Sequence, residues 1–214
     1  MIIKRTNAIA LIPIIFSIAL LTGLLSCGGA PEYTQFRVYP VAKTIKAAPG
    51  TAAFIALKVE IPKGEYLYGN PKGPGIGQPA SVTVEAPGGI EFSPARYLPA
   101  EKHASEYEPE LYNWVYFNET TLFLPFSVKK GSAPGTVTAK VHFSGQTCST
   151  FCVKRDADVE IAIEILPDGS PLQAEEGDLA GLYVTSRPGG DDAEISAAEP
   201  AQPSFYQRAL SFVP

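Results

Sequence analysis

The segment Val137-Thr138-Ala139-Lys140-Val141-His142-Phe143 decides the fold class of this 214-residue chain. Its apolar side chains occupy every second position, and polar or small side chains stand between them. Because successive side chains of a β-strand point to opposite faces of a sheet, the pattern predicts a strand with one buried face and one solvent-facing side. A helix would instead repeat its apolar positions every three or four residues.

The same alternation recurs on both sides of this segment. Three further strands are predicted by their apolar positions: Ile55, Leu57, Val59 and Ile61; Leu122, Leu124, Phe126 and Val128; and Val159, Ile161, Ile163 and Ile165. Shorter strand-like runs lie near residues 36–41, 81–85 and 90–92, separated by turn sequences such as Pro87-Gly88-Gly89. About seven short strands without a convincing amphipathic helix predict an all-β fold, an antiparallel β-sandwich of immunoglobulin type.

Composition argues against one class of function and indicates how the chain divides into parts. The net charge of -5 provides no basic patch for phosphates, which argues against nucleic-acid binding. We expect four parts: a lipoprotein signal peptide at residues 1–26, an N-terminal linker at 27–35, the β-sandwich domain at 36–167 and a tail at 168–214. The tail is rich in Asp, Glu, Ala, Pro and Gly and has few core-forming residues, so it is predicted to be acidic and flexible.

The N-terminus has the layout of an export signal. Lys4 and Arg5 precede an uncharged apolar run at residues 9–25. A single membrane-spanning anchor is the competing interpretation, because the run approaches the roughly 18 apolar residues of a spanning helix. However, Leu24-Leu25-Ser26-Cys27 resembles the bacterial lipobox, whose cysteine is acylated on sulfur and becomes the mature N-terminus. We therefore predict lipidation at Cys27, which anchors the protein in the bacterial cell envelope facing the periplasm, with Gly28 slightly favouring the outer membrane.

The other two cysteines of the chain form the motif Cys148-Ser149-Thr150-Phe151-Cys152, between two predicted strands. One interpretation is a small disulfide that locks the turn. A ring of five residues contributes only about 2 kcal/mol by constraining the unfolded state, compared with about 4 to 5 for a loop that spans a domain. This comparison favours a redox-active pair and leaves a structural disulfide as the alternative.

Motifs in a fixed order lead up to the cysteine pair. They are Gly64-Glu65-Tyr66-Leu67-Tyr68, Asn70-Pro71, Gly75-Ile76-Gly77-Gln78-Pro79, Leu122-Phe123-Leu124-Pro125 and Lys140-Val141-His142-Phe143, followed by the cysteines and the strand at 158–165. From residue 39 to residue 166 this series resembles the N-terminal periplasmic domain of the thiol:disulfide interchange protein DsbD family, including its suppressor-of-copper-sensitivity branch. The chain departs from that pattern at Val153-Lys154-Arg155, where relatives commonly carry a proline.

The resemblance implies an immunoglobulin-like electron-relay domain. It would be a thiol-disulfide oxidoreductase that uses Cys148 and Cys152, with no metal and no other cofactor. Its partners would be a membrane-embedded thiol reductase and periplasmic thioredoxin-like or disulfide-containing proteins. The chemistry is thiolate attack on a disulfide, a mixed disulfide, and resolution by the second thiol. By family analogy Cys152 is the sulfur exposed to partners and Cys148 resolves the mixed disulfide.

Relatives also cover the dithiol with a loop that carries aromatic or acidic residues. The candidate loop here is residues 103–114, with Tyr107, Tyr112 and Trp114 as its aromatic members. Tyr66 and Tyr68 are expected to pack beside the site, and ordinary sandwich core is an equal alternative for both.

Charges and metals supply further hypotheses. Lys154 and Arg155 would lower a thiolate pKa if their side chains turned toward the sulfurs; otherwise they are solvated edge charges. A copper- or zinc-binding lipoprotein would use both cysteines with His103 or His142, although the alternation places His142 on a solvent-facing side. A third possibility is a lipid-anchored module that binds another envelope protein and keeps a permanently oxidised, structural disulfide.

Overall fold

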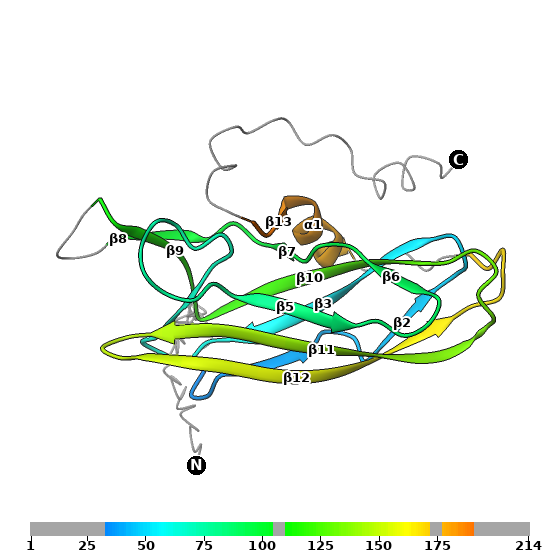
Figure 1. The fold of residues 1–214 in the computed structure, drawn as a ribbon, viewed down its shortest axis with the longest axis horizontal. Coiled ribbons are helices and arrows are strands. Elements are labelled where there is room, and N and C mark those ends of the chain that lie inside the picture. The colour runs from blue at the N-terminus through cyan, green and yellow to red at the C-terminus, as the bar shows by residue number, and fades with distance from the viewer. Residues whose placement is uncertain (1–32, 105–109, 172–176, 191–214) are drawn as a thin grey trace, which may run out of the picture. The chain divides into compact units, whose positions relative to one another are not determined.

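The structure, a computed structural model, describes residues 33–104, 110–171 and 177–190. The predicted signal peptide, Cys27 and the last 24 residues of the predicted tail, 191–214, lie outside these ranges. Within the described residues the strands form two sheets, one of six strands and one of seven, that lie face to face (Figure 1).

The six-stranded sheet runs along one side of the sandwich. Its strands are, in spatial order, β1 (Arg37–Pro40), β3 (Ala52–Glu60), β10 (Glu119–Val128), β7 (Arg96–Tyr97) and β13 (Arg187–Pro188), with β6 (Ile90–Phe92) also paired to β10. The seven-stranded sheet contains β2 (Thr44–Ala47), β12 (Cys152–Ile165), β11 (Gly135–Cys148), β4 (Tyr66–Tyr68), β9 (Tyr112–Phe117) and β8 (Glu101–Ala104), with β5 (Ser81–Glu85) also paired to β11. Among the described strand pairs only β2 and β12 run parallel.

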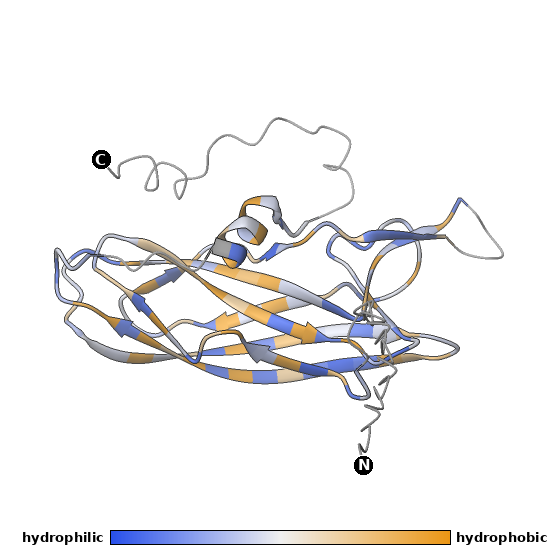
Figure 2. Ribbon diagram, turned by 180° about the vertical axis from the view of Figure 1, so that it is seen from behind, coloured by the Kyte–Doolittle hydropathy of each residue, from blue (hydrophilic) through white to orange (hydrophobic). Residues whose placement is uncertain are grey.

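The core lies between the two sheets, where the predicted alternation places it. One cluster of buried residues joins Ile55 and Leu57 of β3 to Val141 and Phe143 of β11, and Leu57 and Phe143 are both 0 % exposed. Figure 2 shows the matching bands of hydrophobic and hydrophilic residues along the long strands. The predicted immunoglobulin-like β-sandwich is therefore confirmed, and its register follows from burying one face of each long strand.

One outward position differs from the simple alternation. Glu60, at the end of β3, lies between the inward-facing residues Val59 and Ile61, where alternation predicts a solvent-facing side chain, yet it is 6 % exposed. The Tyr39 hydroxyl donates to Glu60 Oε1 at 2.7 Å, and Arg37 Nη1 lies 3.5 Å from Oε2. The carboxylate is buried because these two partners on β1 satisfy it.

One part of the predicted flexible tail, residues 168–214, is ordered in the structure. Residues 177–190, which we call the C-terminal strap, form α1 (Gly177–Thr185) followed by β13, which pairs with β7. Tyr183 of α1 stacks on Phe54 with ring centroids 4.6 Å apart and contacts Phe123 edge-on at 5.5 Å. Because Phe54 and Phe123 stand on the outer face of the six-stranded sheet, covering them stabilises an ordered segment despite its polar composition. In the described part of the chain, no helix is both long and apolar enough to span a bilayer.

The longest hairpin positions the cysteines. The β11 and β12 strands have 14 residues each and pair in continuous register from Gly135 opposite Ile165 to Cys148 opposite Cys152. The tip of this hairpin projects at one end of the sandwich (Figure 1). The cysteine pair is therefore held by the best-paired element of the described chain.

Candidate functional site

The site is built on a disulfide between Cys148 and Cys152 at the hairpin tip. The antiparallel register places the two residues directly opposite each other, with Cα atoms 4.0 Å apart. The turn between them is closed by a hydrogen bond of 3.1 Å from the Ser149 N–H to the Phe151 carbonyl. Two sequence-predicted site residues are thus brought together by strand pairing.

The two sulfur-bearing residues differ sharply in exposure. Cys148 is 1 % exposed and belongs to a buried cluster with Tyr68 and Val115. Cys152, at the first position of β12, is exposed. An incoming thiolate can therefore reach Cys152, whereas Cys148 is sealed from solvent.

Tyr68 supplies the polar contact to the sealed sulfur. Its hydroxyl oxygen lies 3.3 Å from Cys148 Sγ, and in the disulfide form only the hydroxyl carries a proton, so the hydroxyl donates. Burial of the side chain and, to a smaller extent, a hydrogen bond with Tyr66 raise the pKa of Tyr68 above its ordinary value. The hydroxyl therefore stays protonated, and remains a donor, at any pH at which thiols exchange.

A glycine holds the Tyr68 ring in place. Gly77 has φ +133°, and a Cβ atom there would lie 2.5 Å from Cζ of Tyr68. Any side chain at this position would displace the ring, so the loop between β4 and β5 requires glycine where it covers the tyrosine.

An aromatic row extends from the cysteines across the sheet. Tyr66 pairs in register with Cys148 on one side and with Phe117 on the other. The Tyr66 ring contacts Tyr68 edge-on at 5.5 Å and His103 at 4.6 Å. Tyr66 therefore lies next to Cys148 by strand pairing, and Tyr68 lies next to it through its hydroxyl.

The structure describes two of the three candidate cap residues, Tyr112 and Trp114. Tyr107 falls outside the described residues. Tyr112 and Trp114 contact each other at 5.5 Å, and Lys102 Nζ lies 4.2 Å from the Tyr112 ring. Because side chains alternate along β9, Trp114 faces away from the side that carries Phe117. No contact among the described residues joins Tyr112 or Trp114 to the cysteines.

His103 and Phe117 are the aromatic side chains of this region that do lie on the Tyr66 side, with ring centroids 6.1 Å apart. His103 was predicted as the first residue of the candidate cap loop and as a possible metal ligand, whereas Phe117 lies outside that loop. Side-chain alternation within Tyr112–Phe117 could have identified Phe117 from the sequence, since residues 113, 115 and 117 share one face of the strand.

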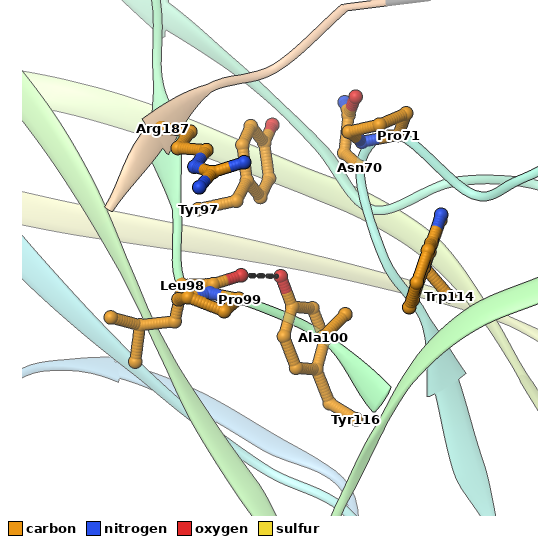
Figure 3. Close-up of a pocket in the computed structure, with 9 residues that line it drawn as sticks. All are labelled: Asn70, Pro71, Tyr97, Leu98, Pro99, Ala100, Trp114, Tyr116 and Arg187. Atoms are coloured by element: carbon orange, nitrogen blue, oxygen red, sulfur yellow. Dashed lines mark hydrogen bonds between the residues drawn. The ribbon is translucent and has the colours of Figure 1, made fainter. Parts of the chain in front are cut away.

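Trp114 instead lines a small apolar pocket of about 190 Å³. Figure 3 shows the nine residues around it, which come from the β4–β5 loop, β7 and its following loop, β9 and the strap. The Tyr116 hydroxyl donates to the Leu98 carbonyl at 2.6 Å across its floor (Figure 3).

The nearby cations are committed to other groups. Arg155 donates from Nη2 to Glu65 Oε2 and from Nε to Thr147 Oγ1, both at 2.8 Å. Lys154 Nζ lies 3.2 Å from Asp156 Oδ2. Burial opposes ionisation of Glu65, but the hydrogen bonds with Thr147 and Arg155 and the guanidinium charge outweigh it, so the Glu65 pKa lies below its ordinary value. These contacts match the alternative in which neither cation turns toward the sulfurs.

The histidine of the β11 strand is not part of the site. His142 Nδ1 lies 2.8 Å from Asp158 Oδ1, six positions along β11 from Cys148. In residues 33–104, 110–171 and 177–190, no three His, Cys, Asp or Glu side chains gather closely enough to hold a metal ion. The described geometry offers no support for the metal-binding hypothesis.

The chain resembles known proteins both in its sequence family and among solved structures. A family model described as thiol:disulfide interchange protein DsbD, N-terminal, matches residues 35–163. No curated protein sequence matches the chain significantly.

Three solved structures illustrate the structural similarities. The N-terminal periplasmic domain of ScsB from Proteus mirabilis is 14 % identical, with 59 % of this chain and 44 % of that chain covered and a TM-score of 0.41. BcpA, the major pilin subunit of Bacillus cereus, is 11 % identical, with 61 % of this chain and 40 % of that chain covered and a TM-score of 0.38. The periplasmic chaperone SfaE is 10 % identical, with 63 % of this chain and 61 % of that chain covered and a TM-score of 0.33. The matched region is less than half of the ScsB chain and less than half of the BcpA chain.

Proposed function

Because the chain belongs to the family of N-terminal domains of the thiol:disulfide interchange protein DsbD, we propose that it exchanges thiols and disulfides in the cell envelope through Cys148 and Cys152. The observation that carries the proposal is the pairing of one exposed and one sealed cysteine in a single disulfide. This asymmetry directs attack to one sulfur and keeps the other available as an intramolecular resolving thiol.

Reduction of the domain begins with a donor thiolate that attacks Cys152 Sγ. The Cys152–Cys148 bond breaks, a mixed disulfide forms between the donor and Cys152, and Cys148 leaves as a thiolate. The second thiol of the donor then attacks the donor sulfur of the mixed disulfide and releases Cys152. Two electrons have moved to the domain, and the donor has become a disulfide.

Delivery to a client reverses these steps. The Cys152 thiolate attacks a client disulfide, which forms a mixed disulfide and expels one client thiolate. Cys148 then attacks Cys152 Sγ, restores the domain disulfide and releases the second client thiolate. The strand register keeps Cys148 opposite Cys152 throughout, so the resolving step is intramolecular and fast.

Tyr68 assists the thiolate of Cys148. This sulfur carries its negative charge inside a cluster that excludes water, where an unpaired charge is unfavourable. The Tyr68 hydroxyl at 3.3 Å is placed to donate to that charge. Its contribution should therefore be larger in the transition state than in the disulfide ground state.

The proposed setting follows the family. We expect a membrane-embedded thiol reductase as the electron donor and periplasmic thioredoxin-like or disulfide-containing proteins as clients. Lipidation at Cys27 would hold the domain at a membrane surface facing the periplasm, and metabolic labelling with palmitate in wild type and Cys27→Ala tests that anchor.

The reduction potential of the Cys148/Cys152 couple tests the function. The protein is equilibrated in thiol buffers of defined potential, and alkylated cysteines are counted by mass. A value between roughly -120 and -270 mV supports exchange. A value well below about -300 mV describes a disulfide too stable to exchange, and the domain would then be a lipid-anchored binding module with a structural disulfide.

Single-cysteine variants provide the matched pair for this test. Cys148→Ala leaves the exposed Cys152, which should accumulate a mixed disulfide with a partner because no resolving thiol remains. Cys152→Ala keeps only the sealed Cys148 of this pair and should accumulate far less, and Cys27 is replaced by Ala in both variants. Equal trapping by the two variants would contradict the assigned roles.

A further inference from the structure

We propose that Ile76 and Phe151 form an apolar clamp around the disulfide, which docks the surface of a partner protein that carries a reactive dithiol. The proposal rests on the function above and adds the element that selects protein thiols over small thiols. The partner is identified by its chemistry: a cysteine with a low thiol pKa, presented from an apolar surface, as at a helix N-terminus.

The two clamp residues are unusually exposed for their type. Ile76 is 86 % exposed and Phe151 is 80 % exposed, the highest values among the large apolar side chains of the described residues. Each exposes apolar area that folding does not bury, although a single exposed residue is in itself ordinary. Two such residues, one next to Cys152 in the chain and one in the loop that covers Tyr68, indicate an interaction surface near the disulfide.

Both residues are held close to the sulfurs. Phe151 precedes Cys152 in the turn that the disulfide and the Ser149 to Phe151 hydrogen bond close. Ile76 precedes Gly77, which lies against the Tyr68 ring, and the Tyr68 hydroxyl lies 3.3 Å from Cys148 Sγ. This chain of contacts places the Ile76 backbone at most about 13 Å from that sulfur.

The approach to Cys152 is open. A thiolate attacks a disulfide along the extension of the S–S bond, here from the side of β12 that faces away from β11. In the described structure β12 pairs with β2 only at Ala162–Ile165, at the far end of the strand from Cys152. No described strand therefore covers the outer edge of β12 at the tip, and a partner can reach the sulfur there.

The occupant must be a protein that reacts with the disulfide. The reactive thiol of the partner has to contact Cys152. The surface of the partner must therefore also lie against the residues that surround Cys152. A small thiol needs only the sulfur, whereas a protein also covers Phe151 and Ile76 and gains from burying them. The clamp should therefore change the rate with protein thiols and leave the rate with small thiols unchanged.

The experiment compares two reductants on four proteins. Wild type, Ile76→Ser, Phe151→Ser and Val41→Ser are reduced by reduced thioredoxin and, separately, by dithiothreitol. Val41 is 46 % exposed and lies between β1 and β2, and β2 pairs with the end of β12 that is far from Cys152. Its variant therefore removes an exposed apolar side chain remote from the disulfide. All three side chains to be replaced are exposed, so folding should be preserved.

We expect each clamp variant to lower the second-order rate constant with thioredoxin by about 5- to 30-fold. The dithiothreitol rate and the reduction potential should stay within about twofold and a few millivolts of wild type, and Val41→Ser should match wild type with both reductants. Equal thioredoxin rates in wild type and clamp variants would overturn the clamp. So would equal slowing with both reductants, since the residues would then act on the disulfide itself.

Two further outcomes separate the clamp from the function. If wild type reacts with dithiothreitol but not with thioredoxin, the clamp for a protein dithiol is refuted while exchange chemistry stands. If neither reductant reduces the pair, the proposed function itself fails. A wild type that dimerises in sedimentation while Phe151→Ser stays monomeric would assign the surface to a second copy of the chain and also overturn the proposal.

Discussion

Replacing Tyr68 by phenylalanine should slow reduction of the disulfide without disturbing the fold. The substitution removes one hydroxyl and keeps the ring that fills the space beneath Gly77. The hydroxyl is 3.3 Å from Cys148 Sγ, the sulfur that leaves as a thiolate when Cys152 is attacked. Cys148 is 1 % exposed, so water cannot replace the missing donor.

The magnitude follows from the difference between two hydrogen bonds. A bond to a charged acceptor contributes about 1.5–3 kcal/mol, and a bond between neutral groups about 0.5–1.5 kcal/mol. The variant loses the first in the transition state and the second in the ground state, a net loss of about 1–2 kcal/mol. Since about 1.4 kcal/mol corresponds to a factor of ten, reduction should slow by about 5- to 30-fold.

The assay is rapid-mixing reduction by dithiothreitol at constant pH, followed by acid quench and alkylation. A small thiol is used because it does not depend on the proposed docking clamp. Tyr116→Phe is the matched control, since that hydroxyl donates to the Leu98 carbonyl at 2.6 Å and has no described contact with either sulfur. If Tyr68→Phe reacts within twofold of wild type while folded, another group stabilises the leaving thiolate and the assigned role of Tyr68 is wrong.

Three further changes have defined outcomes. Gly77→Ala should displace the Tyr68 ring, because the new Cβ would lie 2.5 Å from Cζ, and slow dithiothreitol reduction at least as much as Tyr68→Phe. Tyr183→Ala should lower the free energy of unfolding by about 1.5–3 kcal/mol in urea titration, whereas Leu182→Ala, 39 % exposed, should change it by about 0.5 kcal/mol or less. Glu65→Gln should lower the melting temperature at pH 7. Because the Glu65 pKa is depressed in the folded state, the difference in melting temperature from wild type should shrink as pH falls below about 4.5. A difference that stays constant with pH would contradict the ion-pair account.

The alternation of apolar residues was sufficient to predict the long strands. In β3, β10, β11 and β12 one face must enter a shared core, so the positions of Leu57 or Phe143 determine the register of a whole strand. The short strands β4, β7, β8 and β9 have two to six residues, too few for a period to be counted, and their pairing depends on contacts distant in sequence.

The sequence contains an energetic reason to expect the strap, although composition alone does not predict it. Phe54 and Phe123 stand at outward positions of two predicted strands, so something had to cover them. Composition alone assigns the residues after 168 to a solvated tail, because only a few apolar side chains such as Tyr183 do the covering. Likewise the cysteines could be identified from spacing, but which sulfur is sealed depends on the loop that Gly77 brings over Tyr68.

Stability and exchange make opposite demands on a disulfide, and the geometry of this site is compatible with both. The five-residue ring contributes only about 2 kcal/mol, so a partner can open it without unfolding a sandwich whose core lies between the two sheets. The register of β11 and β12 that places the Cα atoms 4.0 Å apart arises from backbone pairing along 14 residues, which does not require the S–S bond. We therefore expect the reduced thiols to remain opposite each other, so that the resolving step needs no search through conformations. A disulfide that closed a long loop would lose this property, because its reduction would release the chain that holds its two sulfurs together.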